Sequence, residues 1–95
     1  MLAATRVDAR LTISAAGELD HHRASTFSDE VRDLLEPHDR EVCLDLSEIT
    51  SCGTAGVIAI LGVRHYIRSQ GCDFVVTEPS GAVYGALQRA RCSTI

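Results

Sequence analysis

The sequence predicts an α/β fold in which helices pack on a mixed, mostly parallel sheet of four to five strands. The first observation is that the apolar pattern switches repeatedly between the two-residue period of strands and the 3.6-residue period of helices. The second is the resulting order, β-β-α-β-α-β-α, whose right-handed crossovers place helices on a mostly parallel sheet after an N-terminal antiparallel pair. The third is the length of 95 residues, which suits one core and predicts a single domain over residues 1–95.

The strands are predicted from short segments in which apolar and polar residues alternate or apolar residues cluster. Gly17 is expected to end the second strand, and residues 48–53 are expected to form a loop because they include small residues. The four predicted strands are residues 5–8, 11–15, 41–47 and 73–78.

Three helices are predicted, over residues 22–36, from Thr54 to about Gly71, and after an N-cap at Ser80. The middle helix is apolar on nearly every side through residues 55–63, so its first half is expected to be buried all round. Residues 92–95 are interpreted as the possible start of another strand.

Composition excludes several classes of function. A formal net charge of −4 and 4% aromatic residues disfavour a nucleic-acid partner, which needs a basic surface or stacking rings. The longest run of apolar residues and glycine is far shorter than the roughly 20 residues of a membrane span. No secretory signal is visible at the N-terminus. We therefore expect no direct membrane insertion and a cytoplasmic location.

The cysteines show no C-x-x-C spacing, so neither a zinc site nor a thioredoxin-like motif is predicted. They are interpreted as packing residues. The alternative is a redox sensor at Cys52, because a helix N-terminus lowers the pKa of a thiol. The four are Cys43, Cys52, Cys72 and Cys92.

Two places in the sequence offer candidate chemistry. Thr54 opens the middle helix, where unpaired N–H groups and the helix dipole favour anions, so it is either a phosphoacceptor or simply an N-cap. Asp20, His21 and His22 stand where the second strand leads into the first helix. Adjacent histidines on an extended chain point in opposite directions, so we expect no metal there, and Asp20 is expected to help cap the helix. No catalytic motif is present, which predicts a protein that is not an enzyme and needs no cofactor.

A family resemblance rests on three segments. The stretch Gly17-Glu18-Leu19-Asp20-His21-His22-Arg23-Ala24 resembles the opening signature of bacterial anti-sigma-factor antagonists of the sporulation type, which are STAS domains. Residues 44–56 resemble that family's D-L-S-x-V-x-F-x-D-S-S-G segment, and residues 71–90 resemble its last strand and helix. The resemblance implies a STAS fold.

The resemblance also implies a function. Such proteins bind an anti-sigma factor, usually a serine/threonine kinase, and thereby release a sigma factor for transcription. The kinase phosphorylates the second serine of D-S-S-G, whose place is taken here by Ala55, while Thr54 and Gly53 take the places of the first serine and the aspartate. Three alternatives remain: Thr54 is the acceptor, the protein is not phosphorylated and always competent to bind, or it belongs to another branch. The partner-binding surface implied by the resemblance consists of Asp20, His21, Ser51, Gly53, Thr54, Ala55, Gly56 and Val57.

The other branch considered is a transport class. The Thr54-Ala55-Gly56 sequence also resembles the STAS subunit of phospholipid-trafficking ABC transporters, the MlaB type, which binds an ATPase subunit. The alternative function is therefore regulation of a transporter ATPase.

Overall fold

The computed structural model of the chain describes residues 2–90 and contains seven helices and strands in the predicted order. The expectation of a strand over residues 92–95 lies outside the described residues. The bounds are β1 Leu2–Val7, β2 Arg10–Leu19, α1 Ala24–Leu34, β3 Glu41–Cys52, α2 Thr54–Ser69, β4 Asp73–Val76 and α3 Gly81–Arg89.

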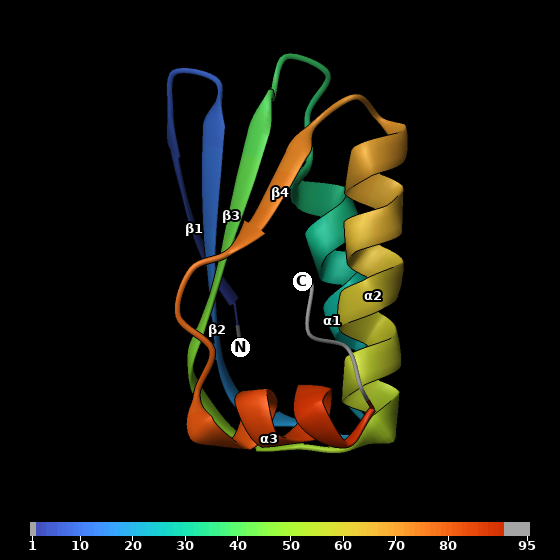
Figure 1. The fold of residues 1–95 in the computed structure, drawn as a ribbon. Helices are drawn as coiled ribbons and strands as arrows, with labels where there is room; N and C mark the ends of the chain where they lie inside the picture. The colour runs from blue at the N-terminus through green and yellow to red at the C-terminus, as the bar shows by residue number, and fades with distance from the viewer. Residues whose placement is uncertain (1, 91–95) are drawn as a thin grey trace.

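The strands form one mixed sheet in the order β1-β2-β3-β4 (Figure 1). β1 pairs antiparallel with β2, whereas the β2–β3 and β3–β4 pairs are parallel. The predicted α/β fold with a mostly parallel sheet is therefore confirmed, with four strands in the part of the chain that the structure describes.

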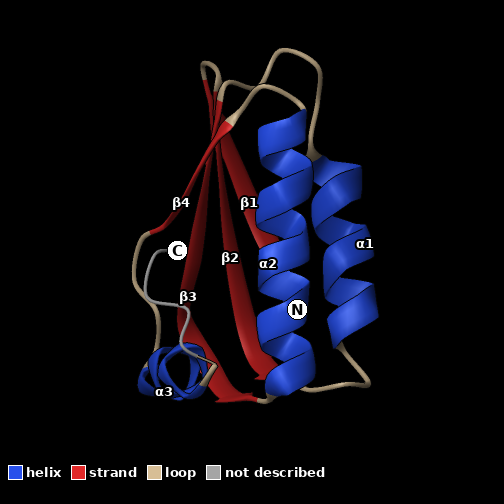
Figure 2. Ribbon diagram, turned by 45° about the vertical axis from the view of Figure 1, so that its right-hand side comes forward, coloured by secondary structure: helices blue, strands red, loops and turns tan. Residues whose placement is uncertain are grey.

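Helices α1 and α2 lie side by side on one face of the sheet, and α3 lies across the end at which β2 and β3 finish (Figure 2). Alternate side chains of β2 and β3 point toward the helices and are fully buried against them. Burial of each such aliphatic side chain stabilises the fold by about 1.5–3 kcal/mol. The largest fully buried side chains are Leu11, Ile13, Val31, Val42, Leu44, Leu46, Ile60, Val63, Ile67 and Val83.

Both long strands continue further than the sequence predicts. Gly17 does not end β2; it adopts a φ of +104° within the strand, next to a shift in the β2–β3 register. Residues 48–52 are not a loop but the last part of β3, and they pair with residues 16–19 of β2. Parallel pairing supplies the backbone hydrogen bonds that hold these small and polar residues extended. As a result, β2 and β3 finish together.

The end of the sheet opposite α3 is fixed by one arginine of β1. The Arg6 guanidinium donates from Nε to Asp39 Oδ1 at 2.8 Å and from Nη2 to Asp39 Oδ2 at 2.9 Å. It also reaches Glu36 Oε2 at 3.0 Å and the carbonyl of Leu34 at 2.8 Å. Asp39 is only 3% exposed and accepts a further bond from the Glu36 N–H. The chain between α1 and β3 is thereby tied to β1.

Two features of the helices bear on the predictions. Ser80 is the N-cap of α3, as predicted, and its Oγ accepts a bond from the Val83 N–H at 3.2 Å. By contrast, α2 is not buried on every side, because Ile58 is 64% exposed. No helix within residues 2–90 has the length and apolar character needed to cross a membrane.

Candidate functional site

The site lies where β2 and β3 end together, at the start of α2. Leu19 and Cys52, the last residues of the two strands, are register partners. The Gly53 N–H donates to the Leu19 carbonyl at 3.3 Å. Asp20, which follows β2, and Thr54, which follows Gly53, are thus brought to neighbouring positions at one end of the sheet.

Gly56 allows α2 to begin this close to β2. A Cβ atom at position 56 would lie 2.4 Å from the Leu19 carbonyl oxygen and 2.8 Å from Cys52 Sγ. Real Cβ atoms do not approach that closely, so only glycine fits without a shift of the backbone. The close contact between α2 and β2 fixes the position of Thr54, the first residue of α2, relative to the end of the sheet.

Thr54 is the first residue of α2, and it is exposed. The interpretation of Thr54 as the N-cap is wrong, because Gly53 holds that position in an extended conformation and no side chain caps the helix. The first turn of α2 also contains no acidic residue. An uncapped helix start presents free backbone N–H groups and the positive end of the dipole. The Thr54 hydroxyl therefore lies at a solvent-facing, electropositive place.

Asp20 organises the turn beside Thr54. Its Oδ1 accepts bonds from the N–H groups of His22 at 3.0 Å and Arg23 at 3.2 Å, so it stabilises the turn that leads into α1. Partial desolvation opposes ionisation of this carboxyl, but those two N–H groups and the neighbouring imidazoles outweigh it and keep the pKa of Asp20 below its usual value. Asp20 therefore carries a full negative charge at neutral pH.

The two histidines do not point in opposite directions, as an extended chain would require. Because residues 21–23 form a turn, the rings of His21 and His22 lie next to each other, with their centroids 4.0 Å apart and their planes tilted by 38°. Both side chains are exposed. In the described part of the chain, no group of three or more His, Cys, Asp or Glu residues is arranged to hold a metal ion.

Cys52 lies beneath the site and is buried. Burial raises the pKa of the Cys52 thiol, although the positive charge of Arg89 acts in the other direction. The expectation of a lowered pKa at this helix start is therefore wrong, and the thiol is less reactive than an exposed cysteine. Its position against Gly56 makes Cys52 a packing residue.

The residues predicted to bind a partner differ in how deeply they are buried. Asp20 and Ala55 are half-buried, whereas Gly56 and Val57 are buried and lie under the surface. The members that solvent reaches freely are His21, Ser51, Gly53 and Thr54.

Two residues of this surface were not predicted from the sequence. Ile58 lies one turn after Thr54 on the same side of α2, and Arg89 of α3 lines a hollow of about 380 Å³ together with Gly53, Thr54 and Val57. The spacing of four residues from Thr54 is the signal that would have identified Ile58. We define the docking surface as Asp20, His21, Ser51, Gly53, Thr54, Ala55, Ile58 and Arg89.

Comparison with known structures shows what this fold is similar to. An anti-sigma factor antagonist from Mycobacterium paratuberculosis matches with a TM-score of 0.81 and 15% identity, over 96% of this chain and 77% of that one. The anti-sigma factor antagonist SpoIIAA in its unphosphorylated form matches with a TM-score of 0.76 and 16% identity, over 97% and 82% of the two chains. Mglu matches with a TM-score of 0.73 and 20% identity over 83% of this chain, which spans 20% of the Mglu chain. At these identities the likeness establishes the fold.

The sequence itself identifies the family. The family model described as "Mlab, STAS domain" matches residues 2–95, which is nearly the whole chain. The order of strands and helices and the fold comparisons agree with that match. The chain belongs to the STAS domain family.

Proposed function

We propose that this chain is a non-enzymatic regulatory module that binds an anti-sigma factor of the serine/threonine-kinase type and so releases a sigma factor. The observation that carries the proposal is the exposed Thr54 hydroxyl at the uncapped start of α2, beside the charged Asp20 turn. The resemblance of residues 17–24 and 44–56 to anti-sigma-factor antagonists supports the same function.

The docking surface has the composition that a protein partner requires. Ile58 is 64% exposed and provides an apolar anchor, Arg89 lines a hollow together with Thr54, and Asp20 follows Leu19, whose carbonyl accepts from the Gly53 N–H. A few buried anchors within a polar rim supply most of the binding energy of a protein interface. The free N–H groups of α2 add donors for acidic or carbonyl groups of the partner.

Phosphorylation of Thr54 would switch this surface off. A phosphate adds about −1.5 to −2 charges at neutral pH. The α2 dipole stabilises a negative charge at an exposed position by only about 0.3–1 kcal/mol. Asp20 would repel the added charge, and an interface would have to desolvate it, which costs more than the dipole returns. The unmodified protein therefore binds its partner, and the modified protein is released.

A second candidate function is regulation of the ATPase of a phospholipid-trafficking ABC transporter. It is favoured by the description of the matching family model and by the Thr54-Ala55-Gly56 sequence. The same docking surface would serve, but the partner would be a transporter ATPase, and Thr54 would act as a contact residue without being phosphorylated.

Binding measurements with both kinds of partner test the proposal. Purified anti-sigma kinases and transporter ATPases from the source organism are titrated against the chain by calorimetry. The Thr54→Glu variant is expected to bind the kinase at least about tenfold more weakly. Ser69→Glu, which adds the same charge at the opposite end of α2, is the matched control and should bind as the wild type does. Equal binding of Thr54→Glu and wild type would place the interface elsewhere.

Incubation with the kinase and ATP identifies the acceptor. Mass spectrometry is expected to locate a phosphate on Thr54 in the wild type and none in Thr54→Val. The Ala55→Ser variant restores the usual acceptor of the family and should be modified at the introduced serine as well. Tight binding to the ATPase alone, with no phosphate on any variant, would favour the transporter function.

A further inference from the structure

The strand β1 forms an open edge of the sheet in the described structure. An edge strand presents unpaired N–H and C=O groups at every second residue, and extended peptides can add to such an edge. Proteins usually protect their edges with lysine, proline or bulges. β1 has none of these over its six residues, and its register with β2 is continuous from Leu2 to Val7. The only charged side chain of β1, Arg6, is already held by Asp39 and Glu36.

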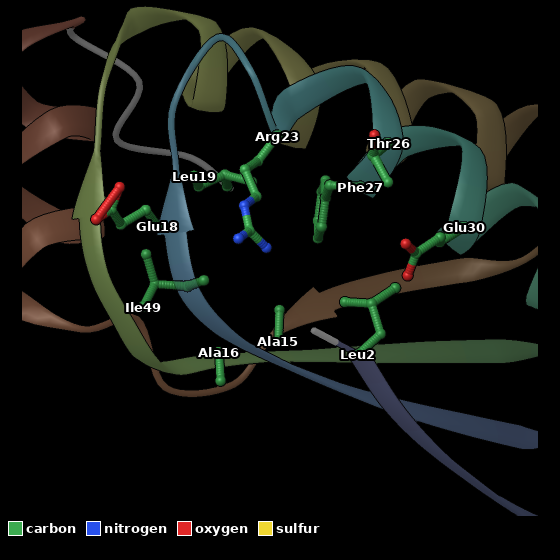
Figure 3. A pocket seen from close by; sticks show the side chains of 10 residues that line it. All are labelled: Leu2, Ala15, Ala16, Glu18, Leu19, Arg23, Thr26, Phe27, Glu30 and Ile49. Carbon is green, nitrogen blue, oxygen red and sulfur yellow. The ribbon is translucent and has the colours of Figure 1, made fainter.

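A groove runs between this edge and α1. It is lined by the apolar side chains of Leu2 and Ala4 of β1 and Leu34 of α1 and by the carboxylates of Glu30 and Asp33 of α1. This part of the groove is a shallow, solvent-open depression of about 260 Å³. A smaller hollow, which also contains Leu2 and Glu30, continues it toward the end of β2, where Figure 3 shows Glu30 projecting from α1 beside Leu2.

The part of the groove beside Ala4 and Leu34 carries two carboxylates and no cation, whereas Arg23 lines the smaller hollow that continues it. Glu30 and Asp33 are three residues apart on α1, so they lie on the same side of the helix. Neither forms an ion pair with any cation within residues 2–90, in contrast to Glu36, which pairs with Arg6. A positively charged segment would therefore bind here with a more favourable free energy than a neutral or acidic one.

We propose that this groove is a second docking surface, which takes an extended, basic segment of a partner protein as an added strand beside β1. Side chains of an added strand alternate between the two faces of the sheet. Arginine or lysine on the helix side would lay its aliphatic stem over Leu2 and Leu34 and bring its charge to Glu30 and Asp33. Small apolar residues on the other side would extend the open sheet face beside Val7, which is 63% exposed. This surface is separate from the docking surface at Thr54, so the inference does not depend on the proposed function.

A peptide titration tests the proposal. The ¹⁵N-labelled full chain is titrated with the capped peptide Arg-Val-Arg-Val-Arg and, as a control, with Glu-Val-Glu-Val-Glu. The basic peptide is expected to slow hydrogen exchange of alternate amides in β1 and to bind more weakly as salt is raised. No binding at millimolar peptide, equal binding of the acidic peptide, or protection at β4 instead of β1 would overturn the proposal.

Charge-neutral variants locate the contact. Glu30→Gln combined with Asp33→Asn is expected to weaken binding of the basic peptide by about three- to tenfold, since each exposed ion pair contributes little alone. Asp29→Asn removes a charge from the same helix outside the groove and should leave the affinity unchanged. An equal loss of peptide affinity in Asp29→Asn would mean that the peptide responds only to the net charge of the protein, and would overturn the inference. So would dimerisation of the free chain through β1 in sedimentation experiments, which would make a second copy the occupant.

Discussion

The two ends of the sheet differ in whether their polar groups are hydrogen-bonded within the chain. At the end near Asp39, a buried carboxylate accepts bonds from Arg6 and from the Glu36 N–H, and every one of these contacts is within the chain. At the end near Thr54, α2 starts without a side-chain cap, and Thr54 is exposed. A satisfied polar network stabilises a fold, whereas free donors on a surface are available to a partner. The first end therefore holds the fold together, and we expect the second to bind.

The largest effect should come from removing the carboxylate at the closed end. Asp39→Ala removes two hydrogen bonds of the Arg6 guanidinium and leaves the Glu36 N–H without an acceptor, while Arg6 keeps Glu36 and the Leu34 carbonyl, so we expect a loss of about 2–4 kcal/mol in the free energy of unfolding. Urea denaturation followed by circular dichroism measures it. Asp73→Ala, at an exposed position of β4, is the control and should change stability by less than about 0.5 kcal/mol. A loss below about 1 kcal/mol in Asp39→Ala would mean that this end does not hold the fold.

The next effect concerns the close contact under the docking surface. Gly56→Ala forces a methyl group against the Leu19 carbonyl, so we expect a loss of about 1–3 kcal/mol and a shift of the α2 start. Gly62→Ala, in the same helix, meets nothing within 4 Å and should gain up to about 1 kcal/mol from helix propensity. The two variants thus separate crowding from propensity. Equal stabilisation of both would show that α2 does not sit as closely on β2 as the structure has it.

The acid response should distinguish the two ends further. The hydrogen bond from Arg6 lowers the pKa of Asp39 most strongly, burial opposes it, and the Glu36 N–H lowers it further. The folded protein therefore holds this proton less tightly than the unfolded chain, whose pKa is about 3.9. The carboxylate contributes stability above that pH and loses it as the pH falls toward the folded pKa.

Denaturation of the wild type between about pH 6 and about pH 3 should show this loss, and Asp39→Asn should depend less on pH over the same range. The change should be smaller than in Asp39→Ala, because a protonated carboxyl still accepts hydrogen bonds. If Asp39→Asn lost stability with acid as steeply as the wild type, other carboxyls would be responsible.

The sequence was informative where a period or a single residue determines the structure. It predicted the order of the helices and strands, the start of α2 at Thr54 and the Ser80 cap, because helical periodicity and capping chemistry are local. It missed the continuation of β2 beyond Gly17 and of β3 to Cys52, because pairing between strands distant in sequence overrides the turn tendency of small residues. The contact between the rings of His21 and His22 and the Arg6–Asp39 pair likewise depend on a turn and on a long-range contact that no local pattern encodes.

The smallest effect on stability would test the comparison most directly. Gly53 has the extended backbone of an N-cap, and a Cβ there meets nothing within 4 Å, so Gly53→Ser fits and its hydroxyl can accept from an N–H in the first turn of α2. We expect a gain of only a few tenths of a kcal/mol over glycine, measured by thermal denaturation. If the partner accepts hydrogen bonds from the free N–H groups of α2, the same substitution should weaken partner binding, because an N–H that already bonds the serine hydroxyl is less available to the partner. Gly81→Ser, at an exposed position at the start of α3 with equal space around it, is the control and should leave binding unchanged. A Gly53→Ser protein that is both more stable and equally tight in binding would show that the open start of α2 is a tolerated imperfection and not part of the interface.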